Sequence, residues 1–138
     1  MKVSQSVAYA VHAVLRLAEN REVSPISCKK LAEQGNMPER FLLQILRDLA
    51  KQGILLSTRG GGGGFMLDRG PGEISLLEVI EAVEGPMGAA LPLKGNFPHP
   101  AGDRLHKVLR TINDEVRRQL QAVTLSDLLG DSPPTRRS

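Results

Sequence analysis

This sequence has a single cysteine and no long apolar run, and both features restrict the kind of protein it can be. Among its 138 residues only Cys28 is a cysteine, so an internal disulfide cannot form, which agrees with a reducing compartment. No apolar run approaches the ~20 residues that a membrane-spanning helix needs. Polar residues also interrupt the N-terminal stretch, where the apolar core of a secretory signal would be continuous. The sequence therefore predicts a cytoplasmic protein that does not enter a membrane.

Acidic residues are scarce in the first part of the chain. Residues 1–60 carry nine lysines and arginines against five acids, residues 61–90 carry one against five, and residues 91–138 carry eight against five. A basic N-terminal part beside an acidic middle is typical of a polyanion-binding surface. Charge alone is equally compatible with a soluble surface on which the charges are unevenly spread.

Patterns that carry catalysis are absent as well. The chain has no Ser/His/Asp or Cys/His arrangement, no paired carboxylates beside a plausible pocket, and no nucleotide-binding motif. Glycines occupy positions 60–64, but a phosphate-binding P-loop would continue with Lys-Ser/Thr and a helix. Phe65 and Met66 follow instead. An enzyme is therefore the least supported of the function classes.

The first fifty residues predict a helix-turn-helix. Residues 3–18 have helical spacing with one apolar stripe. Ser27 is placed to cap a short second helix that ends at Gly35. Pro38 suits the first position of a third helix, which is expected to run to Gly53. Two short helices joined around a glycine are typical of this motif.

The third helix has two distinct faces at ~100° per residue. An apolar arc is predicted to consist of Phe41, Leu42, Ile45, Leu46 and Leu49. The opposite arc, within ~60°, contains Arg40, Gln44, Arg47 and Lys51. A recognition helix needs apolar residues that seat it and donors that face a DNA groove. An ordinary amphipathic helix with a solvated cationic face has the same pattern, so the helix alone does not decide between them.

The glycine run separates two short apolar segments, residues 54–58 and 65–67, which predicts a β-hairpin. A plain flexible hairpin tip is one interpretation. The other is a wing, with Arg59 at its base and placed to enter a minor groove. We favour the wing because the hairpin directly follows the helix-turn-helix.

A capping box, Ser75 with Glu78, predicts a fourth helix that ends at Gly85. Glu78, Glu81 and Glu84 alternate with apolar residues along it, which favours a solvated outer face over an acid or metal site.

A long helix is expected from Arg104 to Val123, with Asp103 as its cap. It would span ~30 Å. Its apolar residues form a narrow stripe suited to a partner helix. The stripe consists of Leu105, Val108, Leu109, Ile112, Val116 and Leu120. A short helix from Thr124 would then end at Gly130.

The predicted fold class is mainly α with a small β-hairpin wing: a winged helix-turn-helix followed by a long C-terminal dimerisation helix. The chain divides into a DNA-binding domain (1–85), a Gly/Pro-rich loop (86–102), dimerisation and short C-terminal helices (103–130), and a disordered tail (131–138).

Contiguous motifs add a resemblance. Ser57-Thr58-Arg59-Gly60 through Gly64-Phe65 is followed by Glu73-Ile74-Ser75-Leu76 and then by residues 79–86, VIEAVEGP. Together with residues 123–128, VTLSDL, this pattern resembles the IscR/NsrR/CymR-type bacterial transcription regulators over about residues 3–129. The resemblance implies a homodimer whose long helices cross. Each recognition helix and wing would meet one half-site of a near-palindrome, most often to repress transcription.

The resemblance also implies site residues. Residues of the third helix would face the major groove, the base of the wing would reach the minor groove, and residues of the first two helices would contact phosphates. The full predicted DNA-binding set is Ser4, Gln5, Tyr9, Ser27, Lys29, Glu39, Arg40, Gln44, Arg47, Lys51, Arg59, Gly60 and Gly61. Leu43 stands where relatives often have a glutamate, and a leucine cannot accept from a cytosine amine.

One departure from the family is chemical. Many members hold an iron–sulfur cluster through three cysteines before the long helix, and residues 86–106 contain none. No cofactor is therefore expected. His99, Asp103 and His106 lie near this region without a recognised metal-site spacing, and Cys28 is expected to be a buried small residue. Residues 86–102 are the candidate site for an unidentified effector.

Two binding hypotheses follow for function. The first is a DNA-binding transcriptional regulator acting as a homodimer on double-stranded DNA. The alternative is a winged-helix protein-interaction module that no longer binds DNA. The basic face of the third helix favours the first, because loss of DNA binding would leave those arginines without a shared purpose.

Overall fold

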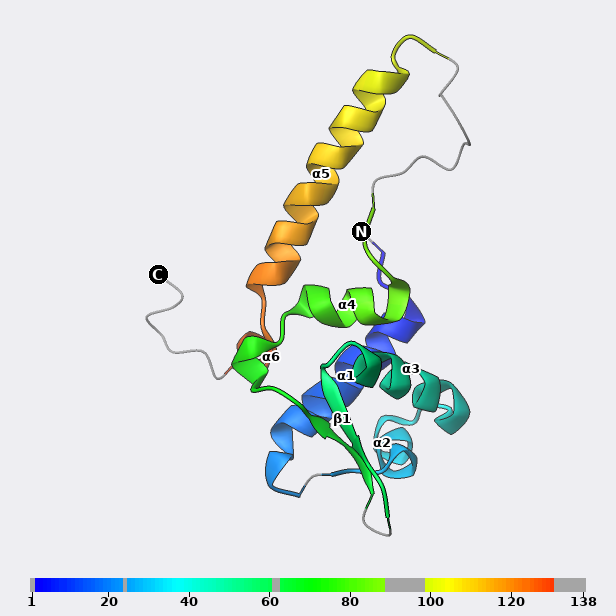
Figure 1. Ribbon diagram of the computed structural model, residues 1–138, viewed down its shortest axis with the longest axis vertical. Helices are drawn as coiled ribbons and strands as arrows, with labels where there is room; N and C mark the ends of the chain where they lie inside the picture. The colour runs from blue at the N-terminus through cyan, green and yellow to red at the C-terminus, as the bar shows by residue number, and fades with distance from the viewer. Residues whose placement is uncertain (1, 24, 61–62, 89–98, 131–138) are drawn as a thin grey trace.

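The computed structural model describes residues 2–23, 25–60, 63–88 and 99–130 (Figure 1). The described chain is mainly helical, with one two-stranded antiparallel hairpin, as predicted. Its elements are α1 (Gln5–Glu19), η1 (Arg21–Val23), α2 (Cys28–Gly35), α3 (Glu39–Lys51), β1 (Leu55–Thr58), β2 (Gly64–Leu67), η2 (Pro71–Glu73), α4 (Leu76–Glu84), α5 (Gly102–Ala122) and α6 (Leu125–Leu129).

The core lies where α1 passes between the other elements. Helix α1 contacts α2, α3, α4, α6 and strand β2. Its Leu17 packs in one fully buried apolar cluster with Leu31 of α2, Leu46 of α3 and Leu125 of α6. Removal of this apolar surface from water makes the largest favourable contribution to the free energy that holds the helices together.

The helix-turn-helix forms as predicted, with small shifts at its boundaries. The Ser27 hydroxyl accepts from the Lys30 amide at 3.1 Å and caps α2, and α2 ends at Gly35. Pro38 is the N-cap of α3 rather than its first helical residue, because its ψ of 123° gives it an extended backbone conformation. Helix α3 ends at Lys51, before the left-handed Gly53 at φ 79°.

The predicted apolar arc of α3 holds for four of its five residues. Leu42, Ile45, Leu46 and Leu49 are buried, but Phe41 is 41% exposed. Phe41 lies at the edge of the arc, where its ring packs edge-on against Tyr9, with centroids 5.6 Å apart. The expectation that Phe41 belongs to the core was therefore wrong.

The hairpin is held to the start of α2. In its register, Leu55 faces Leu67 and Thr58 faces Gly64. Ile26 pairs with Phe65 through two backbone hydrogen bonds, of 2.9 and 2.8 Å. This bridge fixes the position of the wing relative to the helix-turn-helix.

The capping box of α4 is confirmed, since Ser75 and Glu78 bond each other's backbone amides at 3.1 Å. The expectation of a solvated outer face holds for Glu84, which is exposed, but not for Glu78 and Glu81, which are half-buried. Glu78 pairs with Arg69, and Glu81 pairs with Arg117 of α5.

Helix α5 extends away from the rest of the described chain (Figure 1). It begins at Gly102, with Ala101 as its N-cap, so Asp103 lies in the first turn and is not the cap. After α5, the chain returns to the rest of the described structure, which consists of α1 to α4, the hairpin and α6 and is called the body below. The predicted short helix is α6, which Thr124 caps and which stops before the left-handed Gly130, and Leu125 enters the core. The division of the chain into 1–85 and 103–130 stays a prediction, and the predicted tail lies outside the described residues.

Candidate nucleic-acid interface

The outward face of α3 is basic and open to solvent. Arg40, Gln44, Arg47 and Lys51 are all exposed, as the helical wheel predicts. Within the described ranges, none of the three cations forms an ion pair with an acid of this chain. Their charge is therefore available to an external anion such as a phosphate.

Gln44 is oriented by its own helix. Its Nε2 donates to the Asp48 carboxylate at 3.1 Å, one turn further along α3. A carboxylate can only accept, so the amide nitrogen must face Asp48. One N–H and the carbonyl oxygen of Gln44 remain for a base edge, the combination that pairs with adenine in a major groove.

A groove of about 590 Å³ separates α3 from the hairpin. Arg47 and Lys51 line one side of it, and Ser57 and Thr58 of β1 line the other. Ser27 also lines it. The structure thus joins three predicted residues with two wing residues that the sequence analysis did not assign. Their place could have been inferred only from how the hairpin packs beside α3.

The wing base carries Arg59 and Gly60, and both are exposed. Gly60 has a φ of 103°, which disfavours other residues there. Thr58 accepts from the Gly64 amide at 3.0 Å and closes the base of the turn. Gly61 lies outside the described residues, so its predicted role is unplaced.

The predicted phosphate contacts form two groups. Ser27 and Lys29 are exposed at the start of α2. Ser4, Gln5 and Tyr9 lie instead on the first turns of α1: Ser4 caps α1, and Gln5 donates to the Tyr9 hydroxyl at 2.9 Å. The ring contact of Tyr9 with Phe41 places this second group beside the start of α3 rather than in the groove.

Glu39 and Cys28 meet at the start of α3. Glu39 is exposed in the first turn, and its carbonyl oxygen accepts from the Cys28 thiol at 3.5 Å. Cys28 is half-buried and lines the groove, so the expectation of a buried small residue was wrong. Burial, followed by the charge of Glu39, raises the pKa of the Cys28 thiol, while Arg47 acts in the opposite direction. The protonated thiol is thereby favoured, and it is the less reactive form.

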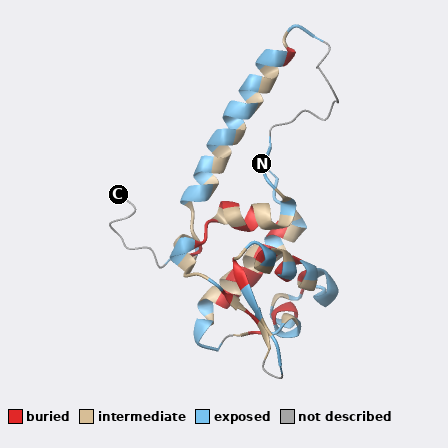
Figure 2. Cartoon of the chain, in the orientation of Figure 1, coloured by how far each residue is buried: buried red, intermediate tan, exposed pale blue. Residues whose placement is uncertain are grey.

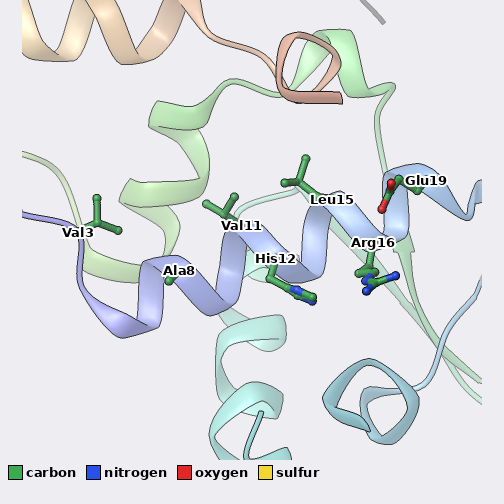
Figure 3. Close-up of a pocket in the computed structure, with 7 residues that line it drawn as sticks. All are labelled: Val3, Ala8, Val11, His12, Leu15, Arg16 and Glu19. Carbon is green, nitrogen blue, oxygen red and sulfur yellow. The ribbon is translucent and has the colours of Figure 1, made fainter. Parts of the chain in front are cut away.

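A second hollow, of about 620 Å³, lies along the outer side of α1 (Figure 3). Its lining consists of Val3, Ala8, Val11, His12, Leu15, Arg16 and Glu19. The His12 Nε2 is buried and has no hydrogen-bond partner among the described residues. A Cβ on Gly35 would lie 2.9 Å from that nitrogen, so α2 packs close to α1 here. No pattern in the sequence indicated this hollow.

Comparison with known proteins decides the class of this interface. Residues 3–131 match the model of Rrf2, described as an iron-dependent transcriptional regulator. The chain belongs to the Rrf2 family.

Two relatives match this chain in sequence over nearly its whole length. An Rrf2-like HTH-type transcriptional regulator from Rhodobacter capsulatus is 31% identical, covering 96% of this chain and 95% of the relative. The HTH-type transcriptional regulator IscR of Cronobacter sakazakii is 31% identical, over 95% and 82%.

Solved structures show the same arrangement. CymR, the global cysteine regulator of B. subtilis, superposes with a TM-score of 0.76 at 28% identity, covering 96% of this chain and 99% of that one. IscR from T. potens gives 0.74 at 30% identity, covering 100% and 93%. This Rrf2 protein is therefore a winged-helix, DNA-binding transcriptional regulator and not an enzyme.

The family description names iron, and the residues of this chain do not fit a family-type iron–sulfur cluster. Three cysteine ligands are impossible in a chain whose one cysteine lies on α2. Among the described residues no group of three His, Cys, Asp or Glu side chains is arranged to hold a metal ion. The Nδ1 of His99 accepts from the Ala101 amide at 3.0 Å. No helix in the described part of this Rrf2 chain is long and apolar enough to cross a membrane.

Proposed function

We propose that the protein is a homodimeric repressor that binds a near-palindromic operator without an iron–sulfur cluster. In each copy, α3 enters the major groove and Arg59 reaches the adjacent minor groove. Repression follows when the operator overlaps a promoter and the bound dimer excludes the polymerase.

The exposed basic face of α3, whose cations have no acidic partner in the described part of the chain, carries this proposal. Arg40, Arg47 and Lys51 lie on the same exposed face of α3 as Gln44, which is already oriented by Asp48. Phosphate contacts give affinity, and a donor–acceptor pair aimed at a base edge gives sequence preference. The groove beside α3 is continuous with the hairpin, so one DNA segment can meet both elements.

Helix α5 supports the homodimer. Exposed residues occur along the whole length of α5 (Figure 2). Val108 and Ile112 lie one turn apart on this helix and are 53% and 52% exposed. Leu105, Leu109, Val116 and Leu120 of the same stripe are half-buried. Full burial of a Val or Ile side chain contributes ~1.5–3 kcal/mol, so pairing of two α5 helices through this stripe would be favourable.

Footprinting on the DNA upstream of the gene tests the proposal. We expect a protected near-palindrome, with half-site centres ~10 bp or a multiple apart and a loss of protection as salt rises. The purified protein should show no visible iron–sulfur absorbance. Arg47→Ala should weaken protection, whereas Arg104→Ala, the same change at the far end of α5, should not.

Absence of protection at low salt, with a folded protein, would instead favour the protein-interaction module. An iron–sulfur spectrum in the purified protein would overturn the proposal that the protein has no iron–sulfur cluster. An effector, for which residues 86–102 are the candidate site, would be sought next as a compound that changes the footprint.

A further inference from the structure

Helix α5 is joined to the body by a backbone pivot at its C-terminal end. The Leu76 amide donates to the Val123 carbonyl at 2.7 Å, and the Leu125 amide donates to the Ile74 carbonyl at 3.0 Å. These bonds form a short bridge between Ser75 and Thr124. A single attachment of this kind holds the end of a helix but does not fix its direction.

A second attachment lies further along α5. One Glu81 carboxylate oxygen accepts from the Arg117 guanidinium and also from the Met87 amide, the latter at 2.8 Å. Asn113 donates to the Met87 carbonyl at 3.4 Å. Glu81 thus joins α4, the start of the following segment and α5. The Glu81 side chain is 23% exposed and that of Arg117 is 35% exposed, so the pair is partly shielded from water.

The distance between the two attachments determines how far a movement at Arg117 displaces the far end of α5. Arg117 precedes Val123 by six residues, or ~9 Å of helix, and the 21 residues of α5 span ~31 Å. A shift of ~1 Å at Arg117 therefore becomes ~3 Å at the far end of α5. That distance is close to the ~3.4 Å between successive base pairs.

We infer that Glu81 is a positioning residue that sets the spacing between the two half-sites the dimer accepts. The inference rests on the proposed function, in which two copies pair through α5. Because the direction of α5 relative to α3 fixes where the second recognition helix lies, the Glu81 junction fixes the distance between the two. A loosened junction lets each body move relative to the paired helices.

A merely structural ion pair makes a different prediction. Partly exposed pairs contribute little to stability. Loss of a pair without a positioning role would therefore change the affinity little, and by the same factor at every spacing. The distinguishing measurement is therefore the dependence of affinity on spacing, not affinity itself.

Glu81→Gln removes the charge but keeps an oxygen that can accept from Met87. Glu84→Gln is the matched control, since Glu84 is an exposed glutamate on the same helix. Each protein would be titrated with operators whose half-site centres are moved by one or two base pairs, and with a single half-site.

For the wild type and Glu84→Gln we expect one preferred spacing. For Glu81→Gln, the ratio of the affinity at this spacing to the affinity at a shifted spacing should fall by about 2- to 12-fold. This factor corresponds to the free energy of ordering one side chain at an interface. Single half-site affinity should not change. Equal spacing profiles for all three proteins would refute the positioning role. A wild type that binds no paired half-sites would overturn the proposed dimer, and the inference with it.

A second readout needs no DNA. A spin label on Cys28, the one cysteine of the chain, reports the distance between the two bodies of a dimer. Glu81→Gln should broaden this distance distribution, and Glu84→Gln should leave it unchanged. An unchanged width in Glu81→Gln would also overturn the inference.

Discussion

Replacement of Gly64 by alanine should detach the wing from the helix-turn-helix. A Cβ at this position would lie 2.4 Å from the Ile26 carbonyl oxygen and 2.8 Å from the Ser27 nitrogen. Both neighbours are backbone atoms, so neither can rotate out of the way as the end of a side chain could. The hairpin must move, and the two hydrogen bonds between Ile26 and Phe65 must lengthen or break.

The size of the effect follows from those bonds. A net contribution of ~0.5–1.5 kcal/mol for each bond predicts a loss of ~1–3 kcal/mol in the free energy of unfolding. DNA affinity should fall as well, because Arg59 and the groove residues of β1 move with the hairpin.

Urea unfolding followed by circular dichroism measures the first effect, and titration with operator DNA measures the second. Gly88→Ala is the matched control, because a Cβ on Gly88 meets no atom of the described residues within 4 Å. If Gly64→Ala unfolds at the same urea concentration as Gly88→Ala and the wild type, the argument from close backbone packing is refuted.

Three further predictions concern the wing, the dimer and the acid response. Arg59→Ala should remove any preference for A·T pairs beside the half-site, measured by competition with G·C-substituted operators, because a narrow minor groove attracts an inserted arginine. An Arg59→Ala protein that keeps this preference would contradict the wing assignment. Ile112→Lys should shift the protein towards the monomer in sedimentation analysis, since the charge would be buried in the paired stripe; a fully dimeric variant would exclude this face. Burial raises the pKa of Glu78, but bonds from Arg69 and Ser75 outweigh it and hold that pKa below the ordinary 4.5. The stabilisation from Glu78 is therefore present above pH 4.5 and is lost as pH falls through the lowered folded-state pKa. Glu78→Gln should unfold with a weaker dependence on pH in that range, and an unchanged dependence would contradict this assignment.

Local features of the fold were predictable because their causes are local in sequence. Ser27 and Ser75 were identified as caps, since each precedes an apolar helical pattern and bonds an amide three residues on. The basic face of α3 follows from helical periodicity alone.

Contacts between distant residues were not predictable in the same way. Glu81 and Arg117 are 36 positions apart, and no pattern in the sequence pairs them. The same holds for Ile26 with Phe65, which anchors the wing. Phe41 was misplaced because a residue at the edge of an apolar arc can turn either inward or along the surface, and its contact with Tyr9 decides the outcome.

The central claim, that the basic face of α3 binds DNA, is tested most directly by the salt dependence of operator binding. The slope of log K against log[salt] would be compared for the wild type, Arg47→Ala and Arg104→Ala. We predict a steep slope for the wild type, a slope reduced by about one for Arg47→Ala, and no change for Arg104→Ala. An operator affinity that is independent of salt and of Arg47 would contradict the account.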